Sequence, residues 1–278
     1  MKFCDLNLST GFGPDLSPPN DKTLLLVHRA GKLHKNNFGT CKQVGAQRHR
    51  DWRQCTVFCT GVLVILKLRK LGALGINFKR EANKQIPAMW WGLSLNNFDT
   101  YSQESSAMRQ MLSAAGLNIY GGKVTHHRSQ MVQTAGSRGL SPWQVCTMTK
   151  HIQDKYHSAY LPEVEEESMK VMSGFRKTES RFVPTEHVVF PGNHKTYLDD
   201  CMKYILPEYS RYVREQESAE GDKTQCCLKV LYEVIPYLVE TVLQVGYYFI
   251  HEYPQHPLTA ILMVSVFCTC SSVLKFGY

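Results

Sequence analysis

Short apolar runs near the N-terminus of this 278-residue chain are followed by apolar positions at helical spacing. Residues 23–28 (TLLLVH) form a short apolar run, which is typical of a buried strand. A second strand is expected over residues 40–46, and the turn-forming pair Gly31-Lys32 between the two predicts a β-hairpin. Residues 7–22 are rich in Gly, Pro, Ser and Asn and predict a loop.

Predicted helices dominate the rest of the chain, and each is supported by apolar spacing or by start and stop residues. Ser141 and Gln144 form a capping box with Pro142 at the first helical position. Pro236 predicts a bend in the longest helix. The predicted helices cover residues 56–71, 102–115, 124–135, 162–173, 197–206 and 224–250, and another begins at Pro142. The expected fold class is mainly α with a small antiparallel β-hairpin or sheet.

The composition is that of an ordinary globular protein, with 43% hydrophobic and 20% charged residues, and it excludes fibrous, collagen-like and fully disordered classes. The net charge of +8 is unevenly distributed. Residues 1–160 contain 21 Lys or Arg and 8 Asp or Glu, whereas residues 161–278 contain 11 and 16, so the two parts carry +13 and −5. A basic part joined to a mildly acidic part is typical of proteins that bind nucleic acid or another anionic surface.

The ten cysteines do not form paired CxxC motifs with zinc-binding spacing, so no metal site is expected. No secretory signal is visible at the N-terminus, and the cysteines are expected to be reduced intracellular thiols. Residues 258–274 are 17 residues without a charge, close to the lower limit for a membrane span. We expect a buried C-terminal element or an altered tail there, and a membrane-tethered interaction protein is an alternative function.

Three residues in the basic part have an informative spacing, because His151 follows Arg128 by 23 residues and Tyr160 follows His151 by nine. With these residues and the motif THHR at residues 125–128, the sequence resembles the tyrosine recombinases, the phage-integrase-like superfamily. In that family an Arg in a short His-rich motif begins a helix, a His or Trp follows two helices later, and the nucleophilic Tyr lies nine residues further on. Lys32 stands where the family has the Lys of its β-hairpin.

A narrower resemblance, to the Crypton-type branch of this superfamily, spans roughly residues 5–257. This branch includes domain II of the large subunit of the budding-yeast centromere DNA-binding complex. The order of the matching segments, rather than any one of them, carries the resemblance. These segments are residues 31–37, 45–55, 124–128, 160–175 and 207–213, together with the apolar helix that follows residue 55.

The resemblance implies a catalytic set for DNA strand transfer that needs neither a metal nor a cofactor. Tyr160 would be the nucleophile, because a Tyr hydroxyl can hold a 3′-phosphoryl group. Arg128 would bind the non-bridging phosphate oxygens, and Lys32 would protonate the 5′-oxygen that leaves. His151 and His126 would assist proton movement. The implied DNA contacts are Lys32, Lys35, Arg48, His49, Arg50, Lys123, His127, Arg128 and Lys150.

The resemblance also implies double-stranded DNA as the partner, a nuclear location and no small-molecule ligand, and it allows a homodimer or larger assembly on DNA. The expected function is that of a DNA-binding protein, a degenerate or fragmentary mobile-element recombinase. The alternative within the family is an active recombinase that forms a 3′-phosphotyrosyl DNA intermediate. The expected domains are a recombinase-like DNA-binding core (residues 1–178), a helical C-terminal region (179–257) and an apolar tail (258–278).

The sequence departs from the family pattern at two places. Thr125 stands where close relatives have the His three residues before the Arg, and His126 is two residues before it. The family's first catalytic Arg lies in a helix that precedes an Asp-Leu pair, and Asp5-Leu6 matches that pair. This Arg is therefore expected upstream of the first residue, and the chain is expected to lack it together with an N-terminal clamp domain.

Alternatives stay open for several of these residues. Tyr156 is the rival of Tyr160, and Lys35 is the rival of Lys32. Residues 48–50 (RHR) are expected to be exposed, either as phosphate contacts or as a solvated charged turn. The Trp pair at residues 90–91 is expected to pack in the core rather than to stack on bases.

Overall fold

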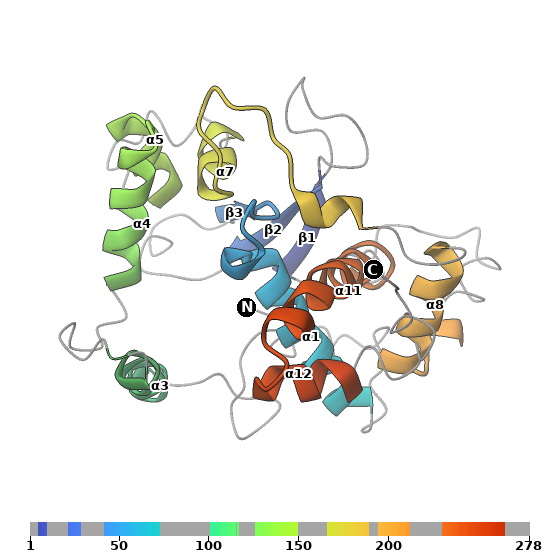
Figure 1. Ribbon diagram of the computed structural model, residues 1–278. Coiled ribbons are helices and arrows are strands. Elements are labelled where there is room, and N and C mark those ends of the chain that lie inside the picture. Colours follow the sequence, from blue (N-terminus) through green and yellow to red (C-terminus); the bar gives the residue numbers. More distant parts are fainter. Residues whose placement is uncertain are drawn as a thin grey trace.

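The computed structural model describes residues 5–9, 22–28, 42–72, 101–114, 116, 126–149, 166–188, 194–211 and 230–264. Its strands are β1 (Leu6–Ser9), β2 (Thr23–His28) and β3 (Lys42–Ala46), which form an antiparallel sheet with β2 in the centre (Figure 1). The two strands predicted from the sequence are confirmed. They pair as neighbours in a hairpin do, from Leu24 opposite Ala46 to His28 opposite Lys42.

The strand β1 lies partly within the segment predicted to be a loop, so that prediction is wrong for residues 7–9. Leu6 and Leu8 pair with residues of β2 and pack against the main core. The Gly and Pro residues of the segment begin at Gly11, beyond the strand. Pairing with a neighbouring strand, which local composition does not reveal, stabilises this four-residue element.

Both faces of β2 are covered, which explains why its sequence is an apolar run rather than an alternation of apolar and polar residues. Leu24 is fully buried in the main core on one face of the sheet. Leu25 points to the other face, where it packs against Met169 of α7 (Glu166–Met172). The sheet therefore lies between α7 and the main helical core (Figure 1).

The main core is built around two helices, α1 (Thr56–Gly72) and α11 (Ile235–Glu252). At Gly61 these helices approach so closely that a Cβ atom would lie 2.7 Å from Val242 Cγ2 and 2.9 Å from the Leu238 carbonyl oxygen. Around this pair lie α8 (His194–Ile205), the π-helical turn η6 (Val230–Val234) and α12 (Pro257–Leu262). One core thus joins elements from before and after residue 178, and the predicted domain boundary at that position runs through it.

A smaller group of three helices contains α4 (His126–Ser137), α5 (Pro142–Thr149) and α7. Its buried residues are Ala135, Leu140, Val145 and Val171. The predicted capping box at the start of α5 is confirmed, because the Ser141 backbone N donates to Gln144 Oε1 over 3.0 Å and the Gln144 backbone N donates to Ser141 Oγ over 3.3 Å. The helix α3 (Tyr101–Ala114), also predicted, lies apart at the lower left of Figure 1.

The other predicted helices are found within a few residues of their expected bounds, so the mainly α fold class with a small antiparallel sheet is confirmed. The longest one differs, because the π-helical turn η6 runs directly into α11, and Pro236 stands just after this junction, in the first turn of α11. Residues 265–274 of the apolar tail lie outside the described ranges. Within those ranges, no helix combines the length and the apolar character that a membrane span requires.

Candidate nucleic-acid interface

Half of the residues to which a catalytic or DNA-binding role is assigned lie outside the described part of the chain. His126, His127 and Arg128 form the first turn of α4, as expected for a His-rich motif that begins a helix. Those outside the described ranges are Lys32, Lys35, Lys123, Lys150, His151 and Tyr160, together with the alternatives Tyr156, Trp90 and Trp91. The catalytic and DNA-binding roles of these residues stay predictions.

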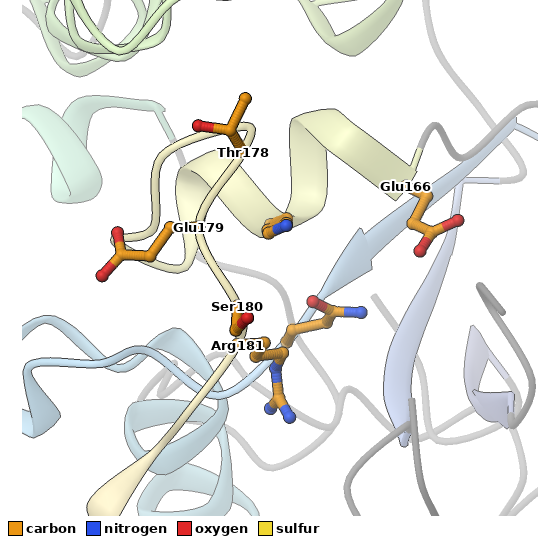
Figure 2. A pocket seen from close by; sticks show the side chains of 7 residues that line it. Glu166, Thr178, Glu179, Ser180 and Arg181 are labelled. Carbon is orange, nitrogen blue, oxygen red and sulfur yellow. The ribbon is translucent and has the colours of Figure 1, made fainter. Parts of the chain in front are cut away.

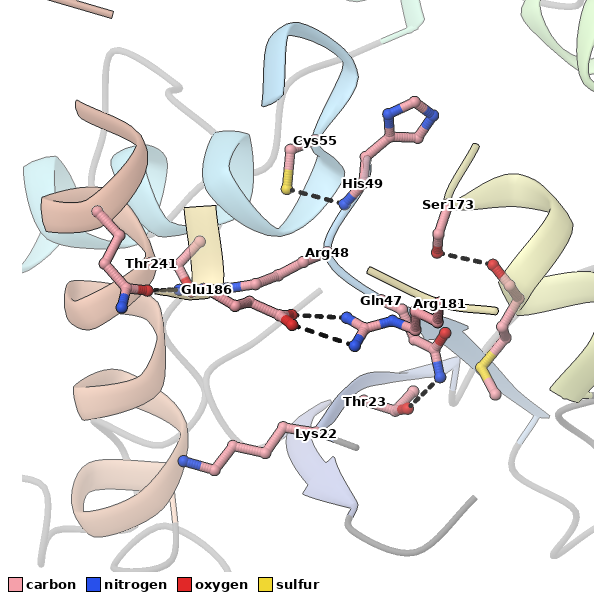
Figure 3. A network of polar contacts seen from close by, with 12 residues as sticks. Lys22, Thr23, Gln47, Arg48, His49, Cys55, Ser173, Arg181, Glu186 and Thr241 are labelled. Carbon is pink, nitrogen blue, oxygen red and sulfur yellow. Dashed lines mark hydrogen bonds and ion pairs between the residues drawn. The ribbon is translucent and has the colours of Figure 1, made fainter. Parts of the chain in front are cut away.

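Arg48 lies in the connection between β3 and α1, and its side chain turns inward. The residue is only 3% exposed, so the prediction that it is exposed is wrong. Its guanidinium donates to Thr241 Oγ1 over 3.0 and 2.8 Å (Figure 3) and to Gln244 Oε1 over 2.5 Å. It also lies over the Tyr237 ring. Arg48 therefore ties the β3–α1 connection to α11 instead of facing a DNA phosphate.

A buried ion pair lies close to this network. Arg181 lies just before the 3₁₀ turn η5 (Pro184–His187), and Glu186 belongs to that turn. Arg181 donates two hydrogen bonds to the Glu186 carboxylate, over 3.1 and 2.6 Å (Figure 3). Both side chains are less than 10% exposed. Burial raises the pKa of the nearby Tyr237 phenol well above its usual range, against the opposing effect of Arg48. This pair and Arg48 stabilise the packing of residues 176–188 and the β3–α1 connection against α11.

His49 is also buried, so the prediction of exposure is wrong for this residue too. His49 Nδ1 lies 2.8 Å from the Asp51 carbonyl oxygen and 2.9 Å from the Asp51 backbone N, so the backbone two residues later holds the ring in place. The ring lies directly against Gly174, where the backbone has a φ of 97° and a Cβ atom would lie 2.8 Å from the ring. Burial lowers the pKa of His49, and the positive charge of Arg138 lowers it further, so the ring is neutral at pH 7.

Arg50 is the one of the three RHR side chains that faces solvent, with 54% of it exposed. Its backbone N donates to the Ser173 carbonyl oxygen over 2.8 Å, and its guanidinium lies over the Phe175 ring. The guanidinium also pairs with Glu179 over 2.6 Å. These contacts hold Arg50 at the carboxyl end of α7, and the predicted exposure is confirmed for this residue alone.

Four cations gather around the carboxyl end of α7, and we call them the α7 basic cluster: Arg50, Arg138, Arg176 and Lys177. Arg138 follows α4 and donates to the Val171 carbonyl oxygen over 2.8 Å. The backbone N of Arg176 donates to Glu179, and Lys177 pairs with Glu167 over 2.8 Å. Three chain segments that are far apart in the sequence thus present positive charge at one place.

Two carboxylates offset part of this charge. The pKa of Glu179 is lowered first by the backbone N–H of Arg176 and then by Arg50. The pKa of Glu167 is lowered chiefly by its bond to Lys177. Both carboxylates are therefore ionised at neutral pH, and among the described residues the cluster retains an excess of positive charge. Arg and Lys side chains on a surface suit contacts to phosphate. A phosphate group can take the place of a carboxylate partner, because both anions accept charge-assisted hydrogen bonds from these side chains.

The sequence interpretation missed Arg138, Arg176 and Lys177. Each of them lies close after a helix end: Arg138 directly follows Ser137, and the other two lie four and five residues after Met172, the last residue of α7. Cations just beyond helix ends are a usable signal, because they are favoured there by the helix dipole and remain at the surface. Their convergence on Arg50 depends on tertiary packing and could not be read from local sequence.

The described residues contain no group of three or more His, Cys, Asp and Glu side chains that could hold a metal ion. No family model, no curated protein and no solved structure matches this chain.

Proposed function

We propose that this protein binds double-stranded DNA through the α7 basic cluster. The observation that supports the proposal is the convergence of Arg50, Arg138, Arg176 and Lys177 on one exposed surface, within a chain whose first 160 residues carry a charge of +13. Arg and Lys side chains on such a surface neutralise backbone phosphates without reading the bases. The proposed binding is therefore largely independent of DNA sequence.

The order of elements supports an architecture similar to the tyrosine-recombinase catalytic domain. Lys32 belongs to the segment that joins β2 to β3, and Arg128 belongs to the first turn of α4. His151 follows α5, and Tyr160 precedes α7. This is the order along the chain in which the family's hairpin Lys, helix-opening Arg, His and Tyr occur.

The proposal predicts that neutralising two exposed cations of the cluster weakens DNA binding. The double variant Arg176→Gln with Lys177→Gln is expected to bind a duplex of about 20 base pairs roughly ten-fold more weakly at low salt, because two phosphate contacts are lost. Fluorescence anisotropy with a labelled duplex measures this directly. Both side chains are exposed, so the fold is expected to be unaffected.

The matched control is the double variant Lys203→Gln with Arg211→Gln. These two exposed cations belong to α8 and the turn that follows it, on the opposite side of the molecule in Figure 1. The control removes the same charge and is expected to change the affinity by less than about three-fold, through the long-range field alone. An equal loss of affinity in both double variants would show that DNA does not contact the α7 basic cluster.

The second candidate function is that of an active tyrosine recombinase, favoured by the position of Arg128 in the first turn of α4. In this reaction the Tyr160 hydroxyl gives its proton to His151 as its oxygen bonds to the scissile phosphorus. The bond from phosphorus to the 5′-oxygen breaks, and that oxygen takes a proton from Lys32. The candidate predicts a covalent protein–DNA adduct on a nicked suicide substrate that survives denaturing electrophoresis. Tyr160→Phe is expected to abolish it, whereas Tyr156→Phe is expected to retain it. If the unsubstituted protein forms no adduct, the recombinase function is wrong and the DNA-binding function stands alone.

A further inference from the structure

We propose that Phe182 and His187 form a stacking platform for an unpaired base of DNA that is bound at the α7 basic cluster. The two aromatic rings stack on each other, with their centroids 4.8 Å apart and their planes inclined by 17°. We call these two residues the ring pair. The inference rests on the proposed DNA binding, and it narrows the ligand to DNA that contains an unpaired base.

The ring pair lies at the surface of the protein. Phe182 is 59% exposed although its ring is stacked on that of His187, and His187 is exposed as well. Phe is among the residue types that are most often buried, so an exposed Phe ring is a notable feature of a surface. Phe182 keeps ring surface open to solvent, and a further planar ring can stack there.

The chain that carries the ring pair is fixed on both sides. Arg181 directly precedes the first ring and Glu186 directly precedes the second, and these two residues form the buried ion pair described above. Between them Val183 and Thr185 are 1% and 3% exposed. The ring pair is therefore supported by buried contacts, and stacking a ligand on it requires little further ordering of the protein.

The segment that carries the ring pair also carries two cations of the α7 basic cluster. Figure 2 shows part of this segment, from Thr178 to Arg181, where it passes a pocket beside α7. Phe182 follows Lys177 by five residues, which is at most about 17 Å along an extended chain. A DNA strand whose phosphates contact the cluster is therefore within reach of the ring pair.

A nucleobase is the ring that these surroundings favour. Every base is joined to a phosphate, and aromatic side chains beside cations are the usual way in which proteins bind unpaired nucleotides. The bases of a paired duplex are stacked on one another and present only their edges in the grooves, so they offer no face to the ring pair. An unpaired base turns outward at the least cost. The ligand that suits both the cluster and the ring pair is thus duplex DNA with an unpaired base.

The experiment compares three forms of one labelled duplex: fully paired, with a single bulged 2-aminopurine, and with an abasic site in place of the bulged base. Fluorescence anisotropy measures the affinity, and the fluorescence of 2-aminopurine, which stacking quenches, reports contact with a ring. We expect the duplex with the bulged base to bind about ten-fold more tightly than the abasic form, with quenching. Both bulged forms have the same flexible backbone, so the difference between them belongs to the base.

Phe182→Leu is expected to remove the preference for the bulged base and the quenching, while the affinity for the paired duplex stays unchanged. The side chain is exposed, so this variant is expected to fold. Phe182→Trp keeps an aromatic face and is expected to retain both effects. The matched control is Tyr248→Leu, which removes an exposed ring of α11 and is expected to behave like the unsubstituted protein.

The inference is wrong if the bulged base and the abasic bulge bind equally well, if the base is not quenched, or if Phe182→Leu and Tyr248→Leu behave alike. Any of these results together with binding of the paired duplex leaves the proposed DNA binding intact. Failure of all three duplexes to bind would overturn both proposals, so the two failures are distinguishable.

Discussion

Replacing Gly61 with Ala is expected to lower the free energy of unfolding by about 2 kcal/mol, although Ala is the better helix former. The added Cβ atom would lie 2.7 Å from Val242 Cγ2 and 2.9 Å from the Leu238 carbonyl oxygen. The second of these atoms belongs to the backbone of α11, so it moves only if the helix moves. Because α1 and α11 form the centre of the main core, separating them loosens contacts along both helices.

Gly136 in α4 provides the matched control. A Cβ atom there would have no neighbour within 4 Å, and the residue is exposed. Gly136→Ala is therefore expected to raise the free energy of unfolding by about 0.5–1 kcal/mol, through helix propensity alone. Urea denaturation followed by circular dichroism measures both variants. Opposite signs are expected, and a stabilising Gly61→Ala would contradict the close packing of α1 on α11.

Elements whose signal is local could be predicted from the sequence. The strand β2 is an apolar run, α1 ends at Gly72 as expected, and the Ser141–Gln144 capping box fixes the start of α5. These features depend on residues within one or two turns of each other. For the same reason the mainly α class with a small antiparallel sheet followed directly from the pattern.

Features that depend on distant residues could not be predicted. The RHR motif looked like an exposed basic turn, yet Arg48 is buried because Thr241 and Gln244, nearly 200 residues later, accept its hydrogen bonds. The α7 basic cluster has the same origin, since Arg50 and Arg138 come together only through the packing of α4 and α7 on the sheet side of the molecule. Charge asymmetry along the chain predicts an anionic partner, but packing determines which cations reach the surface.

The affinity for duplex DNA is expected to depend steeply on salt concentration. If each of the four cations of the α7 basic cluster neutralises one phosphate, the slope of log K against log salt is about −3.6, because each contact contributes about −0.9. Raising the salt from 50 to 200 mM would then weaken binding by about 150-fold. Further contacts from Lys and Arg residues outside the described ranges would make the slope steeper.

The most direct test of the central claim is a salt titration of duplex binding by the unsubstituted protein, followed by fluorescence anisotropy with two duplexes of unrelated sequence. The account predicts a slope of about −3.6 or steeper for both duplexes, and a slope about two units shallower for the Arg176→Gln, Lys177→Gln variant. An affinity that stays constant between 50 and 200 mM salt, or the absence of binding at 50 mM, would contradict the claim that this protein binds DNA through the α7 basic cluster.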